Sequence, residues 1–209
     1  MRLCVSAVLL LLLALTRAAP GPGTEECSKY DILKDKTLIL DRSHLMAAFT
    51  DNDFTRNMLG LIYSHWSSVT ETQTGFREAQ FYKMNGTCLE SGFNITASGD
   101  KYKVQAHGMM TESQLFHLSN TSLIMDVRAT AENLTTIAEK FPLNLSPSDA
   151  SQGVKAHNLY LISKEPELND MDLQRFRAYA KCEGFTGEPD FLRDSSQAYC
   201  TEEESVLIQ

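Results

Sequence analysis

Residues 93–106 read FNITASGDKYKVQA, and this stretch decides the fold class. Apolar and polar residues alternate on both sides of Gly99-Asp100, with Phe93 and Ile95 before it and Tyr102 and Val104 after it. Alternation of this kind is typical of strands with one buried face, and Gly-Asp suits the tight turn between them. The stretch therefore predicts a β-hairpin.

Further strands are predicted on both sides of this hairpin. Upstream they cover residues 59–70 and 76–84, and downstream they cover 115–118, 123–127 and 158–162. Strands at short spacing with turns between them indicate a barrel or a sandwich. The predicted fold class is therefore all-β and mainly antiparallel.

Two segments have helical rather than strand periodicity. Asn169 or Asp170 can cap a helix whose apolar residues share one face, and Gly184 stands where a helix commonly stops. This predicts one amphipathic helix after the last strand. Residues 131–141 have helical spacing too, which predicts a short helix or an irregular connection there.

The first residues have the layout of a secretory signal. A basic start precedes an apolar run from Leu3 to Leu15, and small residues follow at Thr16 and Ala18. An uncleaved membrane anchor is the alternative, but the run is short for a bilayer span. We therefore expect residues 1–18 to be a signal peptide, 19–26 a flexible tail, and the rest a secreted, extracellular protein without membrane insertion.

The cysteines and the glycosylation sequons agree with that route. Loss of Cys4 with the signal leaves four cysteines, Cys27, Cys88, Cys182 and Cys200, which can pair in three ways. The N-x-S/T pattern predicts N-glycosylation at five asparagines, Asn85, Asn94, Asn120, Asn133 and Asn144. Pro147 makes Asn144 the least favourable of the five.

Composition excludes several functions. The net charge is −8, and near −10 once Arg2 and Arg17 are removed, which argues against nucleic-acid partners. The five histidines are scattered without metal-ligand spacing, and no nucleophile elbow or phosphate loop is present. We therefore expect no metal, no cofactor and no enzymatic activity.

Two C-terminal stretches resemble the lipocalin family. Leu159 to Leu168, LYLISKEPEL, resembles the last barrel strand and its exit, and Asp172 to Cys182 resembles the helix that packs on the barrel. Within the family both are most similar to α-1-acid glycoprotein and to its teleost relatives that bind tributyltin or saxitoxin and tetrodotoxin. The resemblance covers roughly residues 27–200, with 201–209 as a C-terminal tail.

This resemblance implies an up-and-down β-barrel with a C-terminal helix and the disulfides Cys27–Cys182 and Cys88–Cys200. One departure concerns the first strand, where lipocalins usually carry Gly-x-Trp. Here His44-Leu45-Met46 runs directly into Ala47 and the following residues, so the first strand is expected to be shortened.

The barrel implies a carrier of small amphipathic, hydrophobic or cationic molecules, by family resemblance tributyltin-like or guanidinium toxins, and a monomer is favoured. Each aromatic, taken singly, is more typical of core packing than of ligand contact. The alternative is a secreted surface-interaction or immunomodulatory glycoprotein with no small-molecule ligand. Alternation along the predicted strands indicates which residues face the interior. The predicted ligand-binding residues are Trp66, Gln80, Tyr82, Met84, Phe116, Tyr160 and Ile162.

Signal removal after Ala18 is directly testable. Thr16 and Ala18 lie three and one residues before the expected cut, so the secreted protein should begin at Ala19. N-terminal sequencing of protein from culture medium checks this. Recovery of a chain that begins at Met1 would contradict it.

Overall fold

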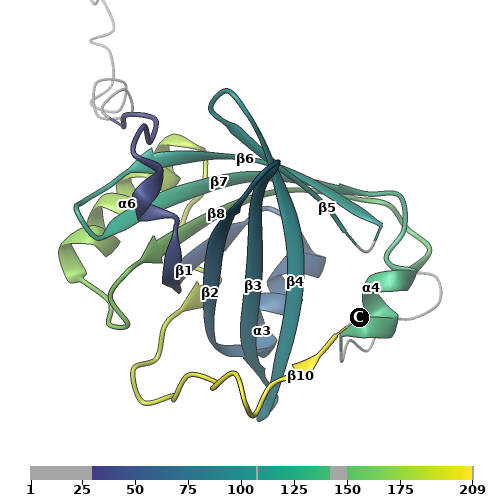
Figure 1. Ribbon diagram of the computed structural model, residues 1–209. Coiled ribbons are helices and arrows are strands. Elements are labelled where there is room, and N and C mark those ends of the chain that lie inside the picture. Colours follow the sequence, from purple (N-terminus) through teal and green to yellow (C-terminus); the bar gives the residue numbers. More distant parts are fainter. Residues whose placement is uncertain (1–29, 107, 142–149, 209) are drawn as a thin grey trace, which may run out of the picture.

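The computed structural model describes residues 30–106, 108–141 and 150–208. Antiparallel strands form the main body of this structure, with the C-terminal helix packed outside them (Figure 1). The strands are β1 (Asp41–Thr50), β2 (Ile62–Thr72), β3 (Gly75–Met84), β4 (Thr87–Ser98), β5 (Lys101–Ala106), β6 (Met109–His117), β7 (Ser122–Ala131), β8 (Val154–Ser163), β9 (Phe191–Leu192) and β10 (Val206–Leu207). The helices are η2 (Lys36–Leu38), α3 (Asp53–Leu61), α4 (Thr135–Lys140) and α6 (Asp170–Cys182).

Within the described residues, strands β1 to β8 close into one barrel. Each strand from β1 to β7 pairs antiparallel with the next one along the chain. The first strand also pairs with the last, from His44 opposite Ser163 to Thr50 opposite Asn158. Closure leaves no open sheet edge between first and last strand, so the predicted up-and-down barrel is confirmed.

The first strand, expected to be shortened, runs alongside β8 from His44 to Thr50. It is ten residues long, and eight of them, from Ser43 onward, are buried. What is short is its ladder with β2, which covers only Asp41 to His44. Beyond that point β9 takes the place of β2, pairing with Ala47 and Ala48. Because both faces of the strand are covered, its sequence lacks the alternation by which the hairpin was recognised.

A helix precedes β2 where the sequence predicted strand. Residues 59–61, assigned to a strand that began at Leu59, are the last turn of α3. The helix begins after Asn52, whose side chain accepts a hydrogen bond from the Thr55 N–H at 3.1 Å. Asp53 places a negative charge in the first turn, where the helix dipole favours it.

The other predicted elements are confirmed. The hairpin of β4 and β5 turns at Gly99-Asp100, where Gly99 has a φ of +64° that a residue with a side chain rarely adopts. Ser119-Asn120-Thr121 connects β6 to β7. Asn169 caps α6, accepting hydrogen bonds from the N–H groups of Met171 and Asp172. The segment with helical spacing before β8 forms α4.

The N-terminal segment closes one end of the barrel. Leu33 packs there against Val69, Phe76 and Leu115. Residues Leu38 to Leu40, at the end of the short η2 helix and just after it, complete the cluster. The Lys36 ammonium lies 5.8 Å from the centre of the Phe76 ring, over its face. Any cavity must therefore open towards the other end, where β1 leads into α3.

The C-terminal segment runs across the outside of the barrel (Figure 1). After β9, the Arg193 N–H donates to Met46 O on β1, and the Trp66 indole N–H on β2 donates to Cys200 O at 2.9 Å. A disulfide then joins Cys200 to Cys88 on β4, as predicted. The expected tail, 201–209, contains β10, which pairs in parallel with β4.

The second predicted disulfide and the glycan sites are only partly within view. Cys182 is disulfide-bonded, but Cys27 lies outside the described residues, so the pair Cys27–Cys182 stays a prediction. Residues 1–18, 19–26 and Asn144 also lie outside them. The other four sequon asparagines are all exposed, namely Asn85, Asn94, Asn120 and Asn133.

Removing the disulfide between Cys88 and Cys200 tests how strongly the C-terminal segment contributes to stability. The bond closes a sequence separation of 112 residues. Replacing both cysteines with serine should lower the free energy of unfolding by about 2–5 kcal/mol, because the unfolded chain gains entropy. Urea titration followed by Trp66 fluorescence measures this. An unchanged unfolding midpoint would show that the bond is dispensable.

Candidate ligand-binding cavity

The barrel encloses a cavity of about 310 Å³. Its wall is formed mainly by inward-facing apolar side chains from all eight barrel strands, among them Val69, Phe93, Val104 and Met125. Small-molecule sites are typically concave, mostly apolar and supplied with a few polar groups. This cavity meets that description, and its volume lies at the lower end of the usual range.

Two short helices cover the mouth of the cavity. From α3, Phe54, Met58 and Leu59 face the interior, and from the region of α4, Leu134 and Ile137 do so. These side chains belong to apolar clusters that extend from the barrel wall to the helices. Among the described residues, the mouth is therefore covered by hydrophobic side chains.

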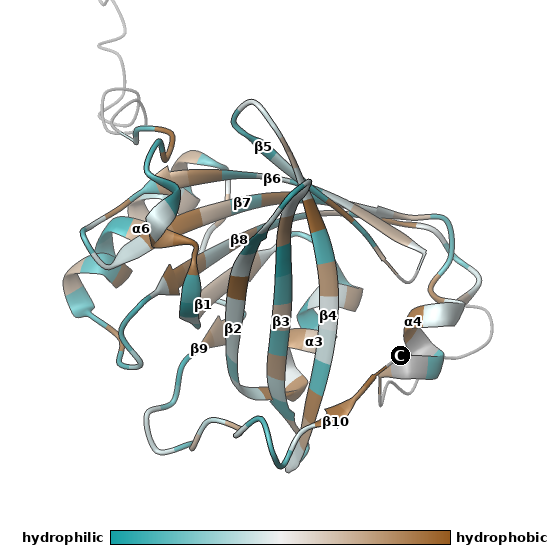
Figure 2. Cartoon of the chain, in the orientation of Figure 1, coloured by the Kyte–Doolittle hydropathy of each residue, from teal (hydrophilic) through white to brown (hydrophobic). Residues whose placement is uncertain are grey.

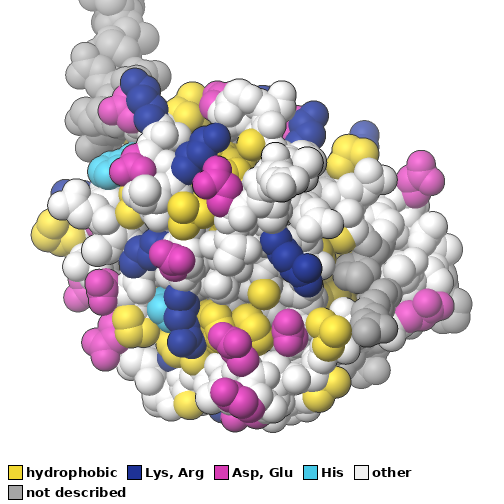
Figure 3. Space-filling view, in the orientation of Figure 1, with side chains coloured by type: hydrophobic (Ala, Val, Ile, Leu, Met, Phe, Trp, Pro, Cys, Tyr) yellow, Lys and Arg dark blue, Asp and Glu magenta, His cyan; other side chains and the backbone are white. Residues whose placement is uncertain are grey.

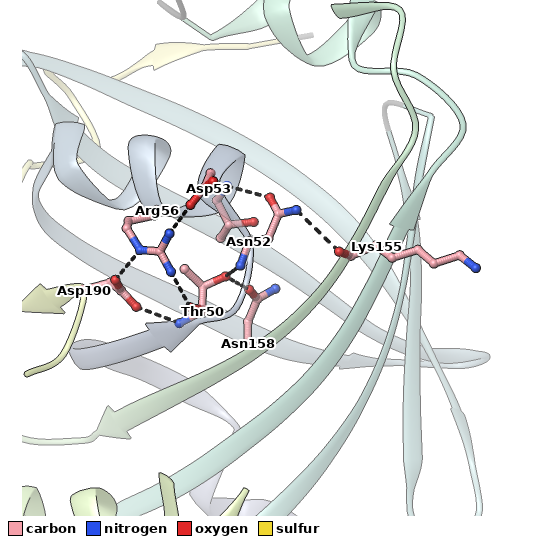
Figure 4. A network of polar contacts seen from close by, with 8 residues as sticks. Thr50, Asn52, Asp53, Arg56, Lys155, Asn158 and Asp190 are labelled. Atoms are coloured by element: carbon pink, nitrogen blue, oxygen red, sulfur yellow. Dashed lines mark hydrogen bonds and ion pairs between the residues drawn. The ribbon is translucent and has the colours of Figure 1, made fainter. Parts of the chain in front are cut away.

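A polar network fixes α3 to the barrel rim (Figure 4). The Arg56 guanidinium donates to the Asp190 carboxylate at 2.7 Å and to Thr50 O at 3.0 Å. Asp190 also accepts from the Thr50 N–H at 2.8 Å, and the Thr50 hydroxyl donates to the Asn158 side chain at 2.6 Å. The network thereby joins α3 to β1, to β8 and to the residue just before β9. The side of the mouth that α3 covers is therefore held in place.

One group of polar side chains breaks the apolar lining on β2 and β3. Ser67, Glu78, Gln80 and Tyr82 all face the cavity, and the Tyr82 hydroxyl donates to the Gln80 side-chain oxygen. Glu78 is the only carboxylate among the described lining residues, and none of them is Lys or Arg. The part of the Glu78 side chain that is not covered by protein therefore faces the cavity. No Lys or Arg among the described lining residues balances its charge.

Burial determines the protonation of this group. Desolvation raises the pKa of Glu78, while hydrogen bonds with Gln80 and Ser67 act in the opposite direction. Desolvation is also the cause that raises the pKa of Tyr160 across the cavity to about 12, so the phenol stays neutral. A carboxyl group in such a site gains from a positively charged partner that replaces the lost water.

His65 lies beside this group and stays neutral. Burial first, and then the nearby His44, lowers the pKa of His65 to about 3. Its ring centre is 4.7 Å from that of Tyr82, and its Nδ1 is buried without a hydrogen-bond partner in the described chain. An unpaired buried ring nitrogen of this kind is uncommon in folded proteins.

Four of the seven predicted ligand-binding residues line the cavity, namely Gln80, Tyr82, Tyr160 and Ile162. The other three do not. Trp66 points to the outside of β2, where it stacks on Phe81 at 4.0 Å beneath the C-terminal segment. Phe116 faces outward against Tyr179 of α6. Met84 is fully buried in the cluster under α4.

Trp66 and Phe116 are misplaced for the same reason. Buried aromatic residues are expected in the interior, but this barrel is also covered on the outside by α6 and by the C-terminal segment. Met84 instead packs under α4 and does not line the cavity. Sequence reasoning also missed Glu78, His65 and the whole of α3. Glu78 was within reach, because it lies two residues before Gln80 and so shares its face of the strand.

The cavity is separate from the clusters that have metal-ligand geometry. Asp126, His157 and Glu183 come together outside the barrel, under α6. His157 is 3.0 Å from Asp126, and Arg128 lies 3.8 Å from Asp126 and 3.7 Å from Glu183. The arginine supplies the positive charge that these carboxylates need, so the cluster is an ion-pair network joining α6 to the barrel.

The surface charge does not single out another site on the face in view. Acidic and basic side chains are interspersed there (Figure 3). None of the helices described here is both long and apolar enough to cross a bilayer.

The buried carboxyl should weaken the fold in a pH-dependent way. Because the pKa of Glu78 is raised in the folded state, its protonated form is favoured there, and stability is lost as pH rises from about 4.5 through the folded pKa. Glu78→Gln should therefore unfold at higher urea than the native protein, with an advantage that grows by about 1.4 kcal/mol per pH unit across that window and then levels off.

Urea titrations between pH 4 and pH 8 measure this advantage. Glu71→Gln, at the exposed end of β2, is the matched control and should follow the native curve. An advantage of Glu78→Gln that is the same at every pH would contradict the assignment.

Comparison with known proteins supports the architecture. No protein-family model matches the sequence, and no curated protein matches it significantly. Among solved structures, lipocalin 12 from rat epididymis is similar with a TM-score of 0.61 at 8% identity, over 86% of this chain and 96% of that one. The siderocalin Ex-FABP, described as functioning through dual ligand specificities, has a TM-score of 0.55 at 13% identity, over 77% and 96%. The bovine lipocalin allergen Bos d 2 has a TM-score of 0.51 at 13% identity, over 72% and 88%. The chain therefore has the lipocalin fold.

Proposed function

We propose that this protein is a secreted, N-glycosylated lipocalin of the α-1-acid glycoprotein type that carries a small cationic amphiphile in its barrel. The observation that carries the proposal is the position of Glu78, a single carboxyl group in a mostly apolar cavity without a lysine or arginine in its described lining. A guest with a positive head and an apolar body complements both features.

The size of the cavity sets the expected affinity. Burying roughly 200–300 Å² of apolar ligand surface contributes about 5–8 kcal/mol before the costs of association. The ion pair with Glu78 adds to this, because charges attract more strongly in an enclosed apolar site than in water. Net affinities between about millimolar and about micromolar follow. Organotin cations and guanidinium toxins belong to the class of guests, as the family resemblance suggests.

The polar group on β2 and β3 favours a guest that can also donate a hydrogen bond. His65 offers an unpaired Nδ1, and Tyr82 and Gln80 are already paired with each other. The Gln80 side-chain oxygen keeps a second lone pair, which can accept an amine or guanidinium N–H whose charge lies beside Glu78. The described cysteines are all in disulfides, so no thiolate is available among them for covalent chemistry.

The test compares a charged probe with a neutral one. Mature, oxidised protein is titrated by calorimetry with octyltrimethylammonium and with 1-octanol. Glu78→Gln should weaken the ammonium at least ~tenfold and leave the alcohol within about twofold, since only the ammonium loses its counter-charge. Calorimetry is preferred to fluorescence because Trp66 lies outside the cavity.

Variants of two tyrosines provide the controls. Tyr160→Ala removes a lining side chain and should weaken both probes, whereas Tyr63→Ala removes an exposed ring and should weaken neither. If neither probe binds saturably, the carrier function is wrong, and a surface-interaction or immunomodulatory glycoprotein without a small-molecule ligand is the better account.

A further inference from the structure

The barrel wall changes its pairing between β4 and β5. Strand β4 has twelve residues but β5 has six, and their ladder covers only Ile95 to Ser98 on β4. Nearer the mouth, β4 pairs instead with β10, with Val206 opposite Leu89. The Ile208 N–H extends this contact by donating to Glu90 O at 2.7 Å.

Apolar side chains face the cavity from both strands near the point where β4 stops pairing with β5. Phe93 and Ile95 line it from β4, while Val104 and Ala106 line it from β5, and Met109 does so from β6. The wall between β4 and β5 towards the mouth is therefore mostly apolar on its inner side, with Ser91 as a polar exception on β4. A backbone segment from the far end of the chain completes this wall.

That segment is weakly held. The side chains of Val206 and Leu207 are 60% and 52% exposed, so β10 buries little apolar surface through them. Ile208 packs instead against the cluster that includes Leu134 and Ile137, both of which line the cavity. In Figure 2 this hydrophobic end of the chain lies beside β4 and close to α4.

The disulfide keeps the segment near its place even when β10 is not paired. Cys200 is bonded to Cys88 on β4, the residue next to Leu89, to which Val206 is opposite. A short tether of this kind gives the C-terminal residues a high effective concentration at the wall. Ile208 can therefore leave and return without any change in the rest of the barrel.

We propose that the wall between β4 and β5 is an apolar side arm of the binding site, filled by Ile208 in the free protein, that takes the end of a long alkyl chain. The inference rests on the proposed function, since the cationic head of the same guest lies at Glu78. It makes the ligand class a single-chain cationic amphiphile, longer than the cavity of about 310 Å³ accommodates by itself.

Removing the C-terminal strand tests the side arm. The mature, oxidised protein and a form ending at Ser205 are titrated with trimethylammonium probes bearing 8 and 14 carbons, below their micelle concentrations. Each buried methylene is worth roughly fourfold in affinity. Truncation should leave the 8-carbon probe within about twofold and raise the 14-carbon affinity about tenfold, the gain expected when a competing isoleucine side chain is removed.

Two full-length variants keep the test independent of truncation. Ile208→Ala should raise the ratio of 14-carbon to 8-carbon affinity in the same direction, because it empties the arm. Leu207→Ser changes an exposed neighbour on the same strand and should leave the ratio unchanged.

The outcomes separate the two proposals. If the 8-carbon probe fails to bind the native protein, the proposed function itself is wrong. If it binds and the affinity ratio is equal in all four proteins, the side arm is overturned while the function stands. An equal gain for both probes would also overturn the side arm, because β10 would then only obstruct entry.

Discussion

The backbone ladder between β1 and β8 is the constraint on which the rest of the structure depends. It converts a meander of antiparallel strands into a closed barrel, and closure forces alternate side chains of every strand into one interior. The interior is not completely filled, so a cavity remains, and its lining follows from strand phase. Without that closure Glu78 on β3 and Tyr160 on β8 would not line one cavity.

Strand lengths do not match around the barrel, and other parts of the chain cover the places where they differ. β1 separates from β2 after His44, and β9 and α3 occupy the place that β2 leaves, held by Arg56 and Asp190. β4 extends beyond β5, and β10 pairs with the excess. The packing of β9 and α3 beside β1 is rigid because several hydrogen bonds converge on it. The pairing of β10 with β4 depends on two strand residues and a disulfide, so this pairing can change more easily.

Much of the fold could be predicted from the sequence, because the hairpin at Gly99-Asp100 and the cap at Asn169 are local signals. The start of β2 could not be predicted, because the apolar residue Leu59 fits the pattern of a helix and of a strand. Tertiary packing decides between the two. Trp66 shows the corresponding limit for the site. Alternation identifies which residues share a face, but not which face is the interior when a C-terminal segment covers the outside. Tyr160 and Tyr82 were placed correctly because they lie on the inner face of their strands, while Glu78, on the same face as Tyr82, was not considered.

The central claim is that a cation lies beside Glu78 inside the barrel. A crystal structure of the mature protein with octyltrimethylammonium tests it most directly. The account predicts the nitrogen within about 6 Å of the Glu78 carboxyl group, with the alkyl chain among the apolar residues beneath α3 and α4. A probe bound on the outer surface, or one inside the barrel with its nitrogen at the mouth and away from Glu78, would contradict it.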